Sequence, residues 1–320
     1  MLNTNRQGDS GFGDYCGLTN TEGYFQGSGL TYRRPRGKTI NFRDHIRKKN
    51  SYQDRLAGDF QAYLESDELD ICYQPLVDLE KGTTTGVEAL LRWQHKLAGP
   101  ISPDIFIPVA EQTGAIHALT FRVLDHALRQ LHAWETDGIC IDVAVNLSMF
   151  NLHYENFPLQ VARLLKKWSI APDRLILEVT EGVIMYDPEQ ATRILEKLDN
   201  LGTRLALDDF GTGYSSLSHL ARLPIRELKI DRSLIRDIDK NSKNAVIVCS
   251  TIELAQKLGL KIVAEGVEDI VVLNILKEYG CATAQGYFFS KPVNQVDFKA
   301  WYLNRHGKKY NPPLLPMPQV

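Results

Sequence analysis

Short apolar runs alternate with amphipathic stretches between about residues 50 and 302. The apolar runs have the length and β-branched content of strands, whereas the amphipathic stretches repeat apolar residues at helical spacing, as at Ala191, Ile194 and Leu198. We therefore predict strands over 68–79, 84–93, 141–147, 174–180, 204–209, 227–231, 261–265 and 282–285. Helices are predicted over 117–137, 154–168, 187–200, 214–222, 242–258 and 268–279.

Eight strands with helices between most of them favour an α/β fold of the (β/α)8 barrel type, with a doubly wound open sheet as the alternative. The first two predicted strands lie close together in the sequence, which favours a hairpin between them over a βαβ unit. The chain has 320 residues, and an α/β barrel needs about 250. We therefore predict one barrel domain over 51–302, with flexible segments at 1–50 and 303–320.

Composition narrows the class of protein. Hydrophobic residues make up 43% and charged residues 24%, and the formal net charge is −2, so no general nucleic-acid footprint is present and neither DNA nor RNA is expected as a partner. The five cysteines are widely spaced without a C-x-x-C pair, which favours free thiols in a reducing cytosol. Neither a signal peptide nor an apolar run of about 18 residues is seen. The sequence predicts a soluble, cytoplasmic protein without a transmembrane segment.

Polar residues close the predicted strands one after another. In a barrel, such positions meet at the C-terminal mouth, where enzymes of this fold place their active sites. Taken singly, a strand-end carboxylate is more often a helix cap or a salt-bridge partner than a ligand. Five carboxylates in one mouth would instead repel one another unless cations bind there. The residues concerned are Glu88, Asn146, Glu178, Asp208, Asp209, Lys229, Glu265 and Gln285.

The residue types in this set indicate which cation and which chemistry to expect. Oxygen ligands favour Mg²⁺ or Mn²⁺ over zinc, and the eight histidines form no H-x-H or H-E-x-x-H pair. A carboxylate that bridges two metals about 3.5–4 Å apart is the arrangement that hydrolyses phosphodiesters. Asp208 and Asp209, which precede a flexible Phe-Gly-Thr-Gly loop, suit that role, and Lys229 would orient the water or stabilise charge on the phosphate. An enolase-type site, in which Lys229 removes a proton next to a carboxylate, stays open on these residues alone.

Motifs that follow one another in a fixed order resemble those of the EAL domain family. They are YQP at 73–75, EALLRW at 88–93, ISPDIFIPVAEQTG at 101–114, VNLS at 145–148, EVTE at 178–181, DDFGTGYSSL at 208–217, LKID at 228–231, AEGVE at 264–268 and QGYFFSKP at 285–292. The resemblance spans roughly residues 55–302. It implies a modified TIM barrel with an antiparallel first strand, and a phosphodiesterase that hydrolyses cyclic di-GMP to linear pGpG with two Mg²⁺ or Mn²⁺ ions per active site.

The resemblance also implies roles for individual residues. The implied metal ligands are Glu88, Asn146, Glu178, Asp208, Asp209 and Glu265, and the implied catalytic residues are Lys229 together with Glu88, Asp209 and Glu265. Contacts to substrate or to the attacking water are implied for Gln74, Leu90, Arg92, Asp231 and Gln285. Glu181 is implied to brace the loop at 209–217, which links the metal site to a dimer interface, so a homodimer is expected. Every position matches the family pattern, which favours an active enzyme over the alternative, a non-catalytic cyclic di-GMP receptor.

Overall fold

The structure, a computed structural model, describes residues 31–33, 39–41, 58–64, 69–212, 220, 222–238 and 243–307. The chain divides into two compact units, Met1–Arg55 and Leu56–Val320. In the first unit, β1 (Thr31–Arg33) and β2 (Thr39–Asn41) pair as an antiparallel ribbon. Apart from this ribbon and residues 303–307, the predicted flexible termini lie outside the described residues.

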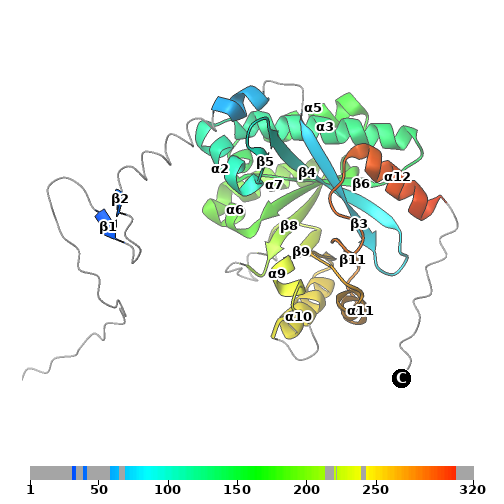
Figure 1. Ribbon diagram of the computed structural model, residues 1–320. Helices are drawn as coiled ribbons and strands as arrows, with labels where there is room; N and C mark the ends of the chain where they lie inside the picture. The colour runs from blue at the N-terminus through cyan, green and yellow to red at the C-terminus, as the bar shows by residue number, and fades with distance from the viewer. Residues whose placement is uncertain are drawn as a thin grey trace, which may run out of the picture. The chain divides into compact units, whose positions relative to one another are not determined.

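Eight described strands of the second unit close into a barrel (Figure 1). Their order around the barrel is β3, β4, β6, β7, β8, β9, β10 and β11, and β11 pairs with β3 to complete it. The strands are β3 (Asp70–Asp78), β4 (Thr84–His95), β6 (Asp142–Asn146), β7 (Leu175–Thr180), β8 (Arg204–Phe210), β9 (Glu227–Ile230), β10 (Lys261–Ala264) and β11 (Thr283–Ala284). All eight predicted strands are present, with ends within two residues of those expected.

Strand β3 departs from a regular (β/α)8 barrel. It pairs antiparallel with both of its neighbours, β4 and β11, whereas the other neighbouring pairs of the barrel are parallel. A short turn joins β3 to β4 through Gly82, whose φ of 68° suits glycine. The predicted hairpin and the modified barrel are confirmed, and closure of the sheet excludes the doubly wound alternative. A short strand, β5 (Gly99–Ile101), pairs with the outer end of β4.

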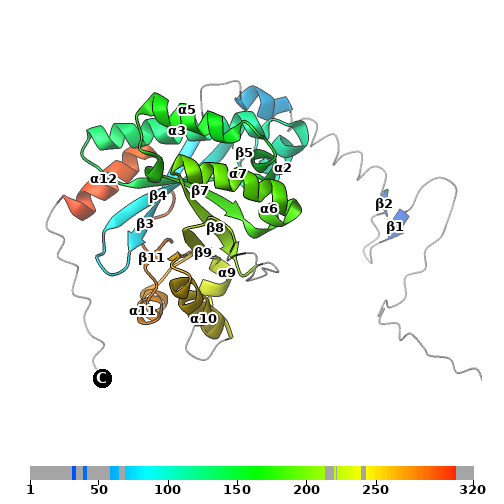
Figure 2. The ribbon, with the colours of Figure 1, turned by 180° about the vertical axis from the view of Figure 1, so that it is seen from behind.

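Helices cover the outside of the barrel, as both views show (Figures 1 and 2). The helix α3 (Ile116–Thr136), with 21 residues, buries one apolar face against the sheet. The other described helices are α2 (Pro103–Thr113), α4 (Met149–Leu152), α5 (Phe157–Trp168), α6 (Glu181–Tyr186), α7 (Pro188–Leu201), α9 (Arg232–Ile235), α10 (Lys243–Lys257), α11 (Ile270–Glu278) and α12 (Gln295–His306), with helical turns at 58–64 and Pro172–Arg174. Within the described part of the chain, no helix combines the length and the apolar composition that crossing a membrane requires.

The helices α2, α4, α6, α9 and α12 correct the sequence-based expectation, which left these segments without a helix. The helix α2 carries Pro108 in its interior, which interrupts the helical signal, and α4, α6 and α9 are too short to show a helical repeat. The helix α12 runs on to His306, past the expected domain end at 302. At that end the Gly307 N–H donates to the Leu303 carbonyl, and Nε2 of His306 lies 2.9 Å from Oγ1 of Thr84 in β4. The expected helix at 214–222 lies mostly outside the described residues.

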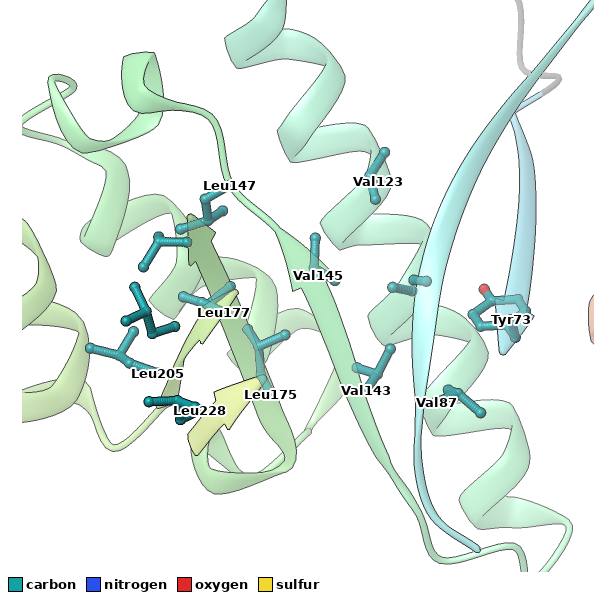
Figure 3. Close-up of a cluster of buried hydrophobic side chains, with 14 of the residues drawn as sticks. Tyr73, Val87, Val123, Val143, Val145, Leu147, Leu175, Leu177, Leu205 and Leu228 are labelled. Carbon is teal, nitrogen blue, oxygen red and sulfur yellow. The ribbon is translucent and has the colours of Figure 1, made fainter. Parts of the chain in front are cut away.

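Alternation along the strands separates an outer from an inner layer of side chains. Figure 3 shows the outer layer, where Val143 and Val145 of β6 face the helix that carries Val123. The residue between the two valines, Ala144, faces inward and forms a separate small cluster with Ile176 of β7 and Ala206 of β8. At mid-height, these three strands therefore contribute an apolar layer to the inside of the barrel.

The same alternation determines which side chains lie toward the two ends of the barrel from that apolar layer. The residues two positions further along these strands are Asn146, Glu178 and Asp208, and those two positions earlier are Asp142, Arg174 and Arg204. Because strand residues two apart share a face, the first set reaches the C-terminal mouth and the second reaches the opposite end. The candidate ligands are thus gathered at one end of the barrel by strand periodicity alone.

Candidate active site

Lys229, at the end of β9, lies among four carboxylates in the barrel mouth. Its Nζ atom is 2.6 Å from Oε1 of Glu265, 2.9 Å from Oε2 of Glu178, 3.2 Å from Oδ1 of Asp208 and 3.7 Å from Oε2 of Glu88. Only 1% of the lysine side chain is exposed. A buried ammonium is stable only beside anions that replace its hydration, and here β4, β7, β8 and the end of β10 each supply one.

Burial opposes the charges in this cluster. It raises the pKa of Glu265 to about 8, although Lys229 lies beside that carboxyl. Burial, together with repulsion from Glu88 and Asp208, also raises the pKa of Glu178 well above its ordinary value. For Glu88, burial is outweighed by Lys229 and by donated hydrogen bonds, so its pKa falls. The single positive charge of Lys229 is therefore too little to keep all of these carboxyl groups ionised. A divalent cation would supply the missing positive charge.

A bulge in β8 brings Asp208 and Asp209 to the same site. The register between β8 and β9 shifts between Leu207 and Phe210, and Asp209 has a φ of 55°, in the left-handed region that non-glycine residues rarely adopt. The Asp209 N–H donates to Oδ1 of Asp208 at 2.9 Å. One oxygen from each of Asp208, Asp209 and Glu265 lies within 4.8 Å of the others. These hard oxygen donors fit a Mg²⁺ or Mn²⁺ ion.

Amide side chains hold Glu88 on both of its oxygens. Nδ2 of Asn146 donates to Oε1 at 2.7 Å, and Nε2 of Gln285 donates to Oε2 at 2.7 Å. Nε2 of Gln285 also donates to Oε1 of Gln74 at 2.9 Å, while Nε2 of Gln74 donates to the Ser290 carbonyl at 3.1 Å. Because that carbonyl can only accept, the chain of bonds fixes the orientation of both glutamine amides. The buried Oε1 of Gln285 is left without a partner among the described atoms.

A cavity of about 550 Å³ opens beside Asn146, within the usual size range of ligand pockets. Leu90 and Arg92, which share a face of β4 with Glu88, line it together with apolar side chains of α2 and α3. Nη1 of Arg92 donates to the Leu91 carbonyl at 3.0 Å, and no described carboxylate forms an ion pair with this guanidinium. Arg92 can therefore meet an anionic group of a ligand.

Two of the expected site residues are placed differently from the rest. Oδ1 of Asp231 accepts from the Ser233 N–H at 2.9 Å and caps α9. Its charge, after burial and the charge of Asp208, raises the pKa of Asp209, so Asp231 stays close to the cluster. Glu181 is buried, and its Oε2 has no hydrogen-bond partner among the described atoms. The loop that Glu181 is expected to brace lies largely outside the described residues.

The sequence pattern missed a polar pair on the wall of the cavity. Oγ of Ser148 donates to Oε1 of Glu111 at 2.6 Å, and both residues line the cavity near Arg92. Glu111 lies on α2, which was not expected. Pro103 directly after Ser102 is a helix-start signal that could have placed α2 and, with it, Glu111.

Fold and site together define a modified (β/α)8-barrel protein with a carboxylate-rich mouth that suits divalent cations. The family model described as EAL domain matches residues 57–292. The chain therefore belongs to the EAL domain family.

Two proteins whose names include cyclic di-GMP phosphodiesterase align with about three quarters of this chain. The bifunctional diguanylate cyclase/cyclic di-GMP phosphodiesterase MucR of Pseudomonas aeruginosa is 43% identical over 241 residues, which cover 75% of this chain and 35% of MucR. The cyclic di-GMP phosphodiesterase NbdA of the same species is 43% identical over 240 residues, which cover 75% of this chain and 31% of NbdA. The chain thus spans about a third of the length of these relatives.

Solved structures agree with this assignment. The cyclic di-GMP complex of the PaMucR phosphodiesterase matches with a TM-score of 0.73 and 42% identity, over 76% of this chain and 99% of that chain. The EAL domain of Mycobacterium smegmatis DcpA matches with a TM-score of 0.62 and 33% identity, over 74% of this chain and 96% of that chain.

Proposed function

We propose that this chain hydrolyses one phosphodiester bond of cyclic di-GMP to give linear pGpG, with two Mg²⁺ or Mn²⁺ ions in the barrel mouth. The observation that carries the proposal is the complete set of carboxylates around Lys229. The names of MucR and NbdA support the substrate and the reaction class. The product and the ion count rest on the family resemblance alone.

The residues of the mouth fit two neighbouring cation sites that share Asp208. Asp209 and Glu265 would complete one site, which is supported by the short spacing of their oxygens. Glu88, Asn146 and Glu178 would complete the other. A bound divalent cation would act as a Lewis acid and lower the pKa of a bound water.

The other residues would bind and orient the substrate. Arg92 would donate two hydrogen bonds to a phosphate, and Leu90 would form an apolar wall beside it. Lys229 would stabilise the negative charge that builds on the phosphate oxygens during attack. Oε1 of Gln285, which has no partner among the described atoms, would accept a hydrogen bond from a water or a substrate hydroxyl. Gln74 would hold the Gln285 amide in place, and Asp231 would help to position the water. The hydroxyl of the water joins phosphorus, one P–O bond breaks, and the proton of the water ends on the leaving oxygen.

The first experiment incubates the purified chain with cyclic di-GMP and Mg²⁺ or Mn²⁺, beside a chelator control and a Lys229→Met variant. Chromatography of the products should show pGpG only with metal and only with Lys229 present. Intact substrate under single-turnover conditions would contradict the proposal. Tight binding without turnover would then identify a cyclic di-GMP receptor, whereas no binding would exclude both functions.

The same resemblance supports a homodimer that uses the region after Asp209, with Glu181 bracing the loop that leads to it. Light scattering coupled to size exclusion would give the mass of the particle directly. A monomer at all concentrations would remove this part of the proposal without affecting the hydrolysis.

A further inference from the structure

Tyr63, in the helix at 58–64 that precedes the barrel, is bonded to the strand that carries Arg92. Its hydroxyl donates to the Arg92 carbonyl at 2.9 Å and accepts from the Asp70 N–H at 3.2 Å. Asp70 and Arg92 are directly opposite each other at the end of the β3–β4 ladder. One phenol oxygen therefore joins both strands of the hairpin to the preceding helix.

The hairpin connects Tyr63 to the carboxylate cluster in three cross-strand steps. Directly opposite residues of an antiparallel pair share a face, so each step lies on the face that lines the mouth. Arg92 and Glu88 are four residues apart, about 13 Å along a strand, a distance suited to opposite ends of an extended anionic ligand. The pairs are Asp70 with Arg92, Cys72 with Leu90, and Gln74 with Glu88.

The helix that carries Tyr63 is itself fixed by packing. The ring of Phe60, which is 1% exposed, lies edge-on to Trp93 at 5.2 Å and stacks on Phe106 at 5.6 Å. Phe106 also lines the cavity beside Arg92. The Tyr63 ring lies 5.7 Å from Trp93. Burial raises the pKa of the Tyr63 phenol, so the hydroxyl keeps its proton and can donate.

We propose that Tyr63 is a positioning residue that holds Arg92 for the phosphate of the substrate. The inference rests on the proposed function, in which Arg92 binds that phosphate. The hydroxyl fixes the peptide of Arg92 before the ligand arrives, so the strand end from which the guanidinium projects is ordered in advance and less entropy is lost on binding. Tyr63 therefore acts on substrate affinity, whereas the chemical step at Lys229 does not depend on it.

The variant Tyr63→Phe tests this role because it removes one oxygen and keeps every ring contact. We expect the Kd for cyclic di-GMP, measured calorimetrically with chelator present, and the KM with Mn²⁺ to rise about three- to tenfold. The kcat should stay within about twofold. The matched control is Asp59→Asn. Oδ2 of Asp59 lies 3.2 Å from Nε2 of His95, so this variant weakens another contact between the same helix and β4. It leaves the bond to the Arg92 carbonyl untouched. Asp59→Asn should change neither constant.

A double-mutant cycle with Arg92→Ala separates positioning from a general effect on folding. If Tyr63 acts through Arg92, Tyr63→Phe adds no further loss of affinity once Arg92 is alanine. Equal losses in both backgrounds, an unchanged Kd in Tyr63→Phe, or an equal loss in Asp59→Asn would each overturn the inference. An unchanged Kd in Arg92→Ala would instead show that the proposed role of Arg92 is wrong. All variants are compared at a temperature at which circular dichroism shows them folded.

Discussion

Lys229 and Glu265 form the shortest of the four ion pairs in the barrel mouth, with 2.6 Å between Nζ and Oε1. Even so, burial raises the pKa of Glu265 to about 8. The charge of Lys229 does not neutralise the whole cluster, because the carboxylates of Glu178 and Asp208 compete with Glu265 for the same ammonium. Metal-free protein is therefore left with a carboxyl that keeps its proton to unusually high pH.

This raised pKa predicts a pH dependence of stability in metal-free protein. A carboxyl that binds its proton more tightly when folded stabilises the fold below its unfolded pKa of about 4.5, and the contribution is lost as pH rises through about 8. The contribution of Glu265 to the free energy of unfolding should thus fall between pH 5 and pH 8, by at most about 1.4 kcal/mol per pH unit for one proton. Chemical denaturation in chelator at several pH values measures the slope for this chain and for Glu265→Gln, and the difference between the two slopes isolates Glu265. A difference of the opposite sign would contradict the assignment.

The variant Glu88→Gln should remove turnover while keeping the fold. The amide has nearly the shape of the carboxylate, but it carries no charge for a cation, and its NH₂ group meets a donor from Asn146 or Gln285. We expect kcat to fall by about 100-fold or more, and the unfolding free energy of metal-free protein to fall by about 1–3 kcal/mol because one buried donor is left without an acceptor. Turnover with Mn²⁺ and denaturation in chelator measure the two effects. Loss of folding would show that Glu88 is structural.

Gly286 allows the segment after β11 to touch the segment after β10. A Cβ at this position would lie 2.1 Å from the Val267 carbonyl oxygen and 2.3 Å from the Val267 nitrogen, and neither backbone atom can move aside easily. Gly286→Ala should therefore displace the segment after Glu265 and lower stability by about 2 kcal/mol or more. Gly58→Ala is the matched control, since its Cβ meets nothing within 4 Å and alanine favours a helix. Equal melting temperatures for the two variants would contradict the close approach.

Strand periodicity made the barrel and most of its site predictable. Asn146, Glu178 and Asp208 each follow an apolar run, and the period of two along a strand is enough to place them at one mouth. The hairpin of β3 and β4 followed from the short spacing of two apolar runs, whereas the barrel with an antiparallel first strand was implied by the family resemblance. These features depend on local sequence, which is why pattern analysis found them.

Features that depend on tertiary contacts were not predictable in the same way. The left-handed conformation of Asp209 arises from the bulge between β8 and β9, and nothing in its residue type indicates it. The bonds from Gln285 to Gln74 and Glu88 join residues about 200 positions apart. Tyr63, which bonds to the Arg92 carbonyl, lies on a helix of seven residues that is too short to show a clear helical repeat in the sequence. Such contacts form only after the chain has folded, so they leave no periodic signal.

The end of the barrel opposite the mouth holds a network of charges with no part in the proposed reaction. Asp142 of β6 accepts from Nε of Arg174 at 2.6 Å and from Nη2 of Arg204. Arg204 in turn donates to Glu227 of β9 at 3.1 Å. In barrels of this type, catalysis takes place at the C-terminal face, and the opposite face serves stability.

The variant Asp142→Asn should therefore separate stability from activity. It leaves Arg174 and Arg204 facing each other without the anion between them, and the side chain of Asp142 is only 22% exposed, so solvent screens the change incompletely. We expect the unfolding free energy to fall by about 1–3 kcal/mol, with kcat and KM unchanged. The exposed pair of Lys197 with Glu155 provides the control, because solvent screens that pair and Lys197→Ala should leave the unfolding free energy almost unchanged. A change in KM without a change in stability would show that this end of the barrel communicates with the mouth.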